Sequence, residues 1–213
     1  MNPELDPAAD APEGGPELRT LDPPALRVLA HPLRSRLLSA LRGCGPATAT
    51  RLAERLDTNT GATSYHLRKL AAVGLVDEMA DRGVGKERWW QAVHEAHTWA
   101  EGDIHDADPD TRHAVAWLRE HYWREFTERS AAWERVRSSW PRAWRDNTGL
   151  SDALVQVSDS QLAELIAEVR AVLARYAVPR FPAEPPPVDA RTVAVYLSAL
   201  PIDVPTPGGG ATR

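Results

Sequence analysis

Residues 59–76 read NTGATSYHLRKLAAVGLV, and this stretch decides how the rest of the chain is interpreted. Asn59 is a residue type that caps helix N-termini, and Gly74 is a typical helix end. Leu67 and Leu70 are spaced as neighbours on one face of a helix. The stretch therefore predicts an amphipathic helix whose first two turns are small and polar, and whose large apolar residues begin only at Leu67.

A helix of this composition suits the major groove of B-DNA, which is wide enough for one α-helix. Small early side chains let its N-terminal end approach the bases, hydroxyl groups can contact bases and phosphates, and cations farther along can hold the backbone. The predicted DNA contacts are Asn59, Thr60, Gly61, Thr63, Ser64, Tyr65, His66, Arg68 and Lys69. Taken singly, these residues have ordinary explanations as a capping cluster, a half-buried histidine and a solvated basic pair.

The segments around this helix are short and punctuated by turn residues. Asp22 predicts the cap of a first helix, and His31-Pro32 ends it and begins a second one that stops at Gly43. A third helix is predicted over 48–56, before the helix that Asn59 caps. Two short strands are then expected around a polar, glycine-bearing tip at 81–86. The predicted order is helix, helix, helix, turn, helix, hairpin.

The distribution of charge supports a nucleic-acid partner for this region alone. The 213-residue chain carries a net charge of −5. Residues 20–95 hold eleven Lys and Arg against eight Asp and Glu, a net of +3, while the segments before and after are each at −4. The one basic segment is thus the one that contains the quoted helix.

The composition also indicates in which cellular compartment the protein is found. No apolar run approaches the roughly 20 residues that span a bilayer. The acidic, Pro- and Gly-rich beginning is unlike a secretory signal and predicts a disordered leader. A single cysteine permits no intrachain disulfide. We expect a cytoplasmic protein with no membrane association.

The C-terminal half has a different pattern. From 111 to 144 apolar residues recur every three or four positions, which predicts one long amphipathic helix, or two in tandem with a break at Pro141. Five of the eight tryptophans lie in this segment. Alternating residues predict strands at 153–157 and 191–200, on either side of a helix that begins with Ser158 and Gln161 at capping-box spacing. The residues expected at a dimer interface or ligand pocket are Trp117, Tyr122, Phe126, Trp133 and Trp140.

The residues from 22 to 95 resemble a known family. The stretches LRVLAHPLRSRLLSAL, TATRLAERLDTNTGATSYHLRKLAAVGLV and RGVGKERWW look like the winged helix-turn-helix of ArsR-type bacterial transcriptional regulators. The resemblance implies a homodimer whose two reading helices enter successive major grooves of a palindromic operator. It also implies that Arg82 and Lys86 lie on the wing that contacts the flanking DNA.

Many proteins of this family sense metals, and this chain departs from their patterns. The helix over 48–56 has no cysteine, and Cys44 precedes it alone. The weak metal-ligand candidates are His94, His97, His105 and His113, although the downstream ligand pair that the family pattern requires is missing. Histidines and carboxylates can form a zinc site, so a metal-responsive sensor remains an alternative; otherwise we expect no cofactor.

The sequence does not favour an enzyme, because it has no phosphate-binding glycine loop, no GxSxG elbow and no HExxH motif. The predicted fold is mainly α with small β: a winged helix-turn-helix domain, a long Trp-rich helix and a small strand-helix-strand module. The predicted function is that of a dimeric repressor that binds double-stranded DNA and could respond to a small-molecule effector. The alternative is a winged helix used for protein interaction. The expected divisions are a disordered leader (1–20), the DNA-binding domain (21–95), a polar link (96–110), the dimerisation helix (111–145), the C-terminal module (150–202) and a disordered tail (203–213).

Overall fold

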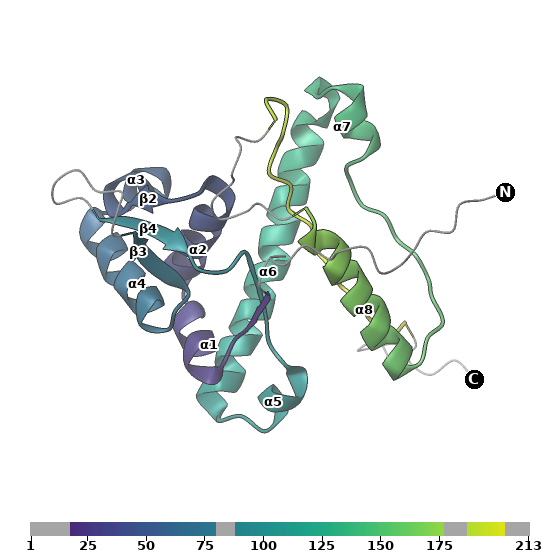
Figure 1. Ribbon diagram of the computed structural model, residues 1–213, viewed down its shortest axis with the longest axis horizontal. Coiled ribbons are helices and arrows are strands. Elements are labelled where there is room, and N and C mark those ends of the chain that lie inside the picture. The colour runs from purple at the N-terminus through teal and green to yellow at the C-terminus, as the bar shows by residue number, and fades with distance from the viewer. Residues whose placement is uncertain (1–17, 80–87, 177–186, 203–213) are drawn as a thin grey trace.

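The computed structural model describes residues 18–79, 88–176 and 187–202 (Figure 1). The predicted class is confirmed: helices dominate, and the N-terminal region is a winged helix-turn-helix. In the described part of the chain, no helix is long and apolar enough to cross a membrane.

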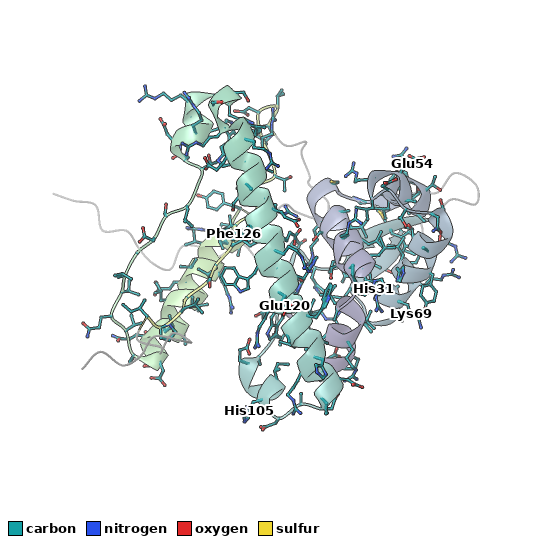
Figure 2. The ribbon with its side chains drawn as sticks, turned by 180° about the vertical axis from the view of Figure 1, so that it is seen from behind. His31, Glu54, Lys69, His105, Glu120 and Phe126 are labelled. Atoms are coloured by element: carbon teal, nitrogen blue, oxygen red, sulfur yellow. The ribbon has the colours of Figure 1, made fainter. Side chains whose placement is uncertain are left out.

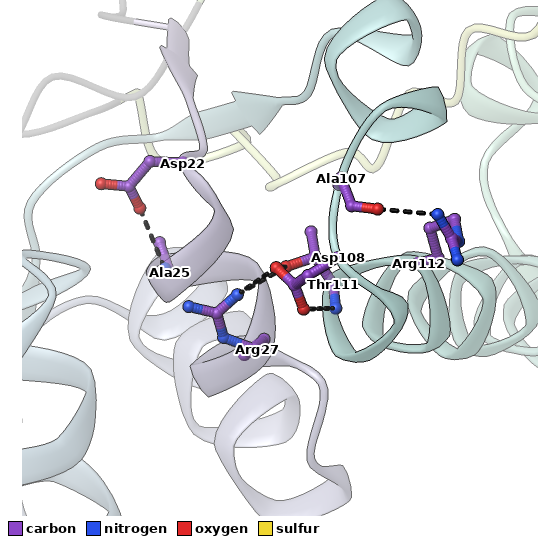
Figure 3. Close-up of polar contacts among 7 residues, drawn as sticks. All are labelled: Asp22, Ala25, Arg27, Ala107, Asp108, Thr111 and Arg112. Carbon is purple, nitrogen blue, oxygen red and sulfur yellow. Dashed lines mark hydrogen bonds and ion pairs between the residues drawn. The ribbon is translucent and has the colours of Figure 1, made fainter.

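The four N-terminal helices occur in the predicted order, and the predicted N-terminal caps are present. Helix α1 (Pro23–Leu29) begins where the Asp22 side chain accepts a hydrogen bond from the backbone N–H of Ala25 at 2.9 Å, as Figure 3 shows. Helices α2 (Pro32–Cys44), α3 (Ala49–Arg55) and α4 (Thr60–Ala72) follow. One predicted end is wrong: α2 passes through Gly43 and ends at Gly45, whose φ of 79° is the conformation that favours glycine.

The predicted hairpin is present. Strands β3 (Val76–Met79) and β4 (Trp89–Ala92) pair antiparallel, and β2 (Ala47–Thr48) pairs antiparallel with the other edge of β4, giving the order β2-β4-β3. The predicted tip at 81–86 lies outside the described residues. Because β2 leads directly into α3 and β3 directly follows α4, this sheet fixes both ends of the helix-turn-helix.

A second, parallel pair of strands was not predicted. Strand β1 (Leu18–Thr20) pairs with β5 (Ala96–Thr98), which joins the end of the expected leader to the start of the expected polar link. The same link forms helix α5 (Glu101–His105), whose Ile104 is buried. The prediction of disorder is therefore wrong at 18–20, and the strand and helix within the polar link were not predicted, since a partner distant in sequence supplies the hydrogen bonds that the strands lack by themselves.

Helix α6 (Pro109–Val136) is fixed to the N-terminal helices by its first turns. Its cap residue Asp108 accepts hydrogen bonds from the backbone and the hydroxyl of Thr111, and Arg27 of α1 donates to both side chains (Figure 3). Val115 and Leu118 are fully buried in the same hydrophobic cluster as the leucines of α1, α2 and α4. One core thus extends from the helix-turn-helix into the first half of α6.

Beyond that core the chain has few buried side chains. The predicted break occurs: a short 3-10 turn (Arg137–Ser139) ends α6, and α7 (Arg142–Asp146) begins after Pro141. Helix α8 (Asp159–Ala174) has both hydrogen bonds of the predicted capping box. It lies on the side of α6 opposite the helix-turn-helix (Figure 1).

The strands predicted on either side of α8 are wrong. Residues 153–157 and 191–200 have no strand pairing, and their side chains are exposed. Alternation of apolar residues is compatible with a strand but does not form one without a partner edge.

Candidate nucleic-acid interface

Helix α4 presents one side to solvent and the other to the core. Leu67 and Leu70 are fully buried, as predicted. Figure 2 shows Lys69 at the outer edge of the N-terminal domain, directed away from α6. The helix-turn-helix therefore leaves α4 accessible along its length, which is the first requirement for entering a DNA groove.

The exposed side carries most of the predicted DNA contacts. Thr60, Gly61, Tyr65, Arg68 and Lys69 are exposed, and the Tyr65 ring is 53% accessible. Ser64 is half-buried beside them. These positions advance by three or four residues, so they form one continuous stripe.

This stripe carries no negative charge, and its two cations, Arg68 and Lys69, lie toward its C-terminal end. None of the 13 residues of α4 is acidic, although Asp or Glu in the first turn would be favoured by the helix dipole. At the N-terminal end, Asn59 accepts a hydrogen bond from the backbone N–H of Ala62 at 2.8 Å. The positive end of the helix is thus exposed and free of intrahelical carboxylates.

Two contacts organise the basic residues. The Arg68 Nε donates to the Ser64 carbonyl oxygen at 3.1 Å, and the Lys69 ammonium lies 5.6 Å from the centre of the Tyr65 ring. A cation at this distance from an aromatic ring is attracted to its face. Both cations therefore lie along the helix, and neither forms an ion pair with a carboxylate within the part of the chain that the structure describes.

Thr63 does not lie on the exposed stripe. Its side chain is 0% accessible, and its hydroxyl donates to the Asn59 carbonyl oxygen at 3.0 Å. The prediction of a DNA contact at Thr63 is contradicted by this burial. The physical reason is the helical turn: Thr63 is four residues before Leu67 and shares its inward direction.

His66 is half-buried against the α1–α2 junction. Its ring centre is 4.5 Å from that of His31, and burial, together with the positive charges of His31 and Arg34, lowers the pKa of His66. A neutral imidazole at this position helps to seat α4 on α2. One side of the His66 ring therefore contacts His31, and the residue is only partly accessible to DNA.

The wing is only partly described. Arg82 and Lys86 lie outside the described residues. At the base of the hairpin, Arg88 and Glu78 form an exposed ion pair at 3.3 Å across β3 and β4.

The predicted aromatic group of the C-terminal half is divided among four places. Trp117 stacks on His121 on the side of α6 near α2. Phe126 contacts Tyr196, and Trp133 contacts Trp140 near the end of α6. Tyr122 belongs to the packing between α6 and the N-terminal domain, so these residues do not form a single pocket.

Tyr122 takes part in a hydrogen-bonded chain that sequence reasoning missed. Arg42 of α2 donates to His97 Nδ1 at 2.6 Å, and His97 Nε2 lies 2.7 Å from the Tyr122 hydroxyl. Because a guanidinium only donates, Nδ1 accepts and the imidazole proton is on Nε2. No local pattern marks these residues, since they come from α2, β5 and α6.

The hydrogen bonds of His97 bear directly on the candidate metal ligands. Both ring nitrogens of His97 are already engaged, and burial beside Arg42 lowers the pKa of His97 to about 3. His105 and His113 are exposed on α5 and α6, and His94 lies between β4 and β5. Within the described ranges, no three His, Cys, Asp or Glu side chains are grouped so as to hold a metal ion.

Comparison with known proteins identifies the N-terminal domain. Residues 29–78, which include α2, α3 and α4, match the model of a helix-turn-helix domain family. No curated protein matches the chain significantly. Residues 29–78 are therefore a helix-turn-helix domain.

Three solved structures are similar to parts of the chain. A possible transcriptional regulator for arsenical resistance is 28% identical over 51% of this chain and 93% of its own. Reduced HlyU from Vibrio cholerae N16961 is 19% identical over 46% and 85%, and RV1404 from Mycobacterium tuberculosis is 17% identical over 72% and 80%. The TM-score is 0.29 in each case, which is too low to support an argument about function.

Proposed function

We propose that this protein is a dimeric, sequence-specific transcriptional repressor that reads a palindromic operator through α4. The observation that carries the proposal is the exposed stripe of α4, which is polar, positive and free of carboxylates from Thr60 to Lys69. Its narrow N-terminal end, formed by Asn59, Thr60 and Gly61, would face the bases. Tyr65 and Ser64 would lie beside them.

The two parts of the stripe would contribute differently to binding. Base contacts from the N-terminal turns would be worth roughly 1–3 kcal/mol of discrimination for each well-formed pair. Arg68 and Lys69 would contact phosphates, which adds affinity for any DNA sequence and makes binding sensitive to salt. The wing residues Arg82 and Lys86 remain further candidates for backbone contacts.

The dimer part of the proposal rests on exposed apolar surface in the C-terminal half. Trp123 and Val136 of α6 are about half accessible, and no residue of α8 is buried. Apolar side chains left accessible on neighbouring helices are candidates for an interface. A second copy that covers it would place two α4 helices on one DNA duplex, where half-sites about 34 Å apart can be read together.

The proposed repressor role rests on the same proposed dimer. A dimer seated across two successive major grooves covers the DNA between its half-sites, so an operator that overlaps a promoter would be closed to polymerase. A ligand that altered the spacing of the two α4 helices would release it. Reporter expression with and without the protein tests this sign of regulation directly.

The first experiment recovers the operator. Purified full-length protein is incubated with fragmented DNA from the native host, and bound fragments are sequenced to identify a common palindromic site. The affinity for that site is then measured by fluorescence anisotropy at several salt concentrations. Absence of any enriched site would contradict the proposal and favour a protein-interaction role for the winged helix.

The matched variants test the assignment to α4. Arg68→Ala and Lys69→Ala should each weaken binding to all DNA sequences and reduce the salt slope by about one. Arg145→Ala is the control, because Arg145 is also exposed but lies on α7, away from α4 and from the helices proposed to bind the second copy. Equal effects of all three changes would mean that non-specific charge, rather than α4, binds the DNA.

A further inference from the structure

A cleft lies between the beginning of α2 and the middle of α6. Its volume is about 550 Å³, within the range of roughly 300–1,000 Å³ usual for small-molecule sites. Pro32 and Arg36 line it from α2, and Trp117, His121 and Arg124 line it from α6. It is separate from the exposed stripe of α4.

One part of the cleft is lined by two stacked aromatic rings. The rings of Trp117 and His121 are nearly parallel, with an interplanar angle of 11° and centres 4.9 Å apart. Burial lowers the pKa of His121, so its ring is uncharged at neutral pH. A stacked, uncharged pair of rings offers favourable contact to another planar aromatic ring.

The charged residues that line the cleft have one more positive charge than negative charges. Three guanidinium groups (Arg36, Arg124 and Arg129) face two carboxylates (Glu125 and Glu128). Arg129 is paired with Glu125. Among the described residues, Arg36 and Arg124 form no ion pair with a carboxylate, so the cleft retains the capacity to bind one anionic group.

We propose that this cleft binds a planar aromatic monocarboxylate, with its ring extending the Trp117–His121 stack and its carboxylate on Arg36 and Arg124. Arginine is suited to this role, since its guanidinium can hold a carboxylate through two parallel hydrogen bonds. A ligand with one negative charge matches the net charge of the lining. A dianion would meet uncompensated repulsion from Glu128.

Arg36 also connects the cleft to the DNA-reading part of the molecule. Its guanidinium donates to the Leu56 carbonyl oxygen at 2.9 Å, and Leu56 ends α3 immediately before the turn into α4. A carboxylate that reorients Arg36 therefore acts on the turn that positions α4. This effector role rests on the proposed function, whereas binding in the cleft does not.

The test uses full-length protein and 2-naphthoate as the probe. Isothermal titration calorimetry without DNA should show saturable binding, with a dissociation constant below roughly 1 mM for a ligand of this size. The neutral analogue 2-naphthamide and the non-aromatic cyclohexanecarboxylate should each bind at least tenfold more weakly. Equal binding of naphthoate and naphthamide, or no saturation, would overturn the proposal.

Variants locate the site and separate the two proposals. Arg124→Gln should weaken naphthoate binding at least tenfold, while the control Arg135→Gln on the same helix should not change it; equal behaviour of the two variants overturns the assignment. Saturating naphthoate should change operator affinity at least threefold in the wild type and much less in Arg36→Lys. An unchanged operator affinity overturns the effector role, and operator recovery without ligand tests the regulator proposal independently.

Discussion

At the residue scale, Thr60 and Thr63 have the same chemistry and different surroundings. Thr60 is exposed, whereas Thr63 is fully buried and hydrogen-bonded to Asn59. Thr63→Ala should therefore lower the free energy of unfolding by about 1–2 kcal/mol, from the lost hydrogen bond and the small cavity. Thr60→Ala should leave stability within about 0.5 kcal/mol and weaken operator binding.

Urea denaturation and anisotropy on the same samples check this pair of predictions. The folded fraction of the Thr63→Ala protein should bind the operator with nearly wild-type affinity. The opposite result, with stability lost at Thr60 and affinity lost at Thr63, would show that the inward face of α4 is wrongly assigned.

A second prediction at this scale concerns His97 and pH. Burial beside Arg42 lowers the pKa of His97 to about 3, compared with about 6.5 in an unfolded chain. Between these values the unfolded chain binds a proton that the folded one does not. The stabilisation is therefore complete above pH 6.5 and is lost as pH falls, by up to about 1.4 kcal/mol per pH unit.

The variant His97→Gln isolates this contribution, because an amide can still accept from Arg42 and donate to Tyr122. His31, His66 and His121, whose pKa values are also lowered, remain in both proteins. Between pH 7 and pH 5 the wild type should lose about 1–2 kcal/mol more stability than the variant. Parallel unfolding curves across this range would contradict the assigned protonation of His97.

At the element scale, Gly61 makes the N-terminal end of α4 narrow without a structural need for glycine. Its φ is not positive, and an added Cβ would meet only the Asn59 Oδ1, at 3.4 Å. Gly61→Ala should therefore keep or raise the stability, by at most about 1 kcal/mol. It should weaken operator binding, because the methyl group would lie between the helix backbone and the base edges.

Thermal melts and operator titrations of this variant give the two quantities separately. An alanine variant that is as stable as the wild type and binds the operator equally well would mean that DNA does not approach α4 at Gly61. Loss of both quantities would instead indicate an unrecognised packing role.

The elements that sequence reasoning predicted correctly are those specified locally. Asp22, Asn59 and Ser158 cap their helices through side-chain hydrogen bonds within three residues, so the residue types alone indicate the start of each helix. Pro141 likewise marks the start of α7, where its fixed geometry separates this helix from the turn that ends α6. These features need no partner from elsewhere in the chain.

The elements and residues that sequence reasoning missed depend on distant partners. Leu18 pairs with Ala96, and Arg42 meets His97 and Tyr122, although no short pattern connects them. The prediction that Thr63 is exposed was wrong because a polar residue in the first turn was assigned to the polar face of the helix. Its direction is set by the helical period shared with Leu67.

At the scale of the whole molecule, burial is distributed unevenly. The core runs from Leu21 to Leu118 and includes the first turns of α6. Past that point, α6 and α8 have apolar side chains that are partly accessible, and Figure 1 shows α8 across α6 from the N-terminal domain. A stable protein interface buries about 800 Å² on each partner, and this surface is where we propose that the second copy binds.

Two residues test this without disturbing the protomer. Val136 and Val172 are each 46% accessible, so aspartate at either position remains solvated in a single chain. Buried between two copies, the same carboxylates would be unpaired, which costs far more than the lost apolar contact. Val136→Asp with Val172→Asp should therefore shift the protein from dimer to monomer, as measured by light scattering after size-exclusion chromatography.

The control is Gly102→Asp, which adds the same charge at an exposed position of α5, where an added Cβ has no atom within 4 Å, outside the apolar surface of α6 and α8. It should leave the dimer intact and retain operator affinity, while the double variant should bind a half-site with the affinity of one domain and lose the full operator. Circular dichroism should show equal helix content in all three proteins. A double variant that stays dimeric would place the interface elsewhere, and the spacing of the two α4 helices would then have to be derived from that other surface.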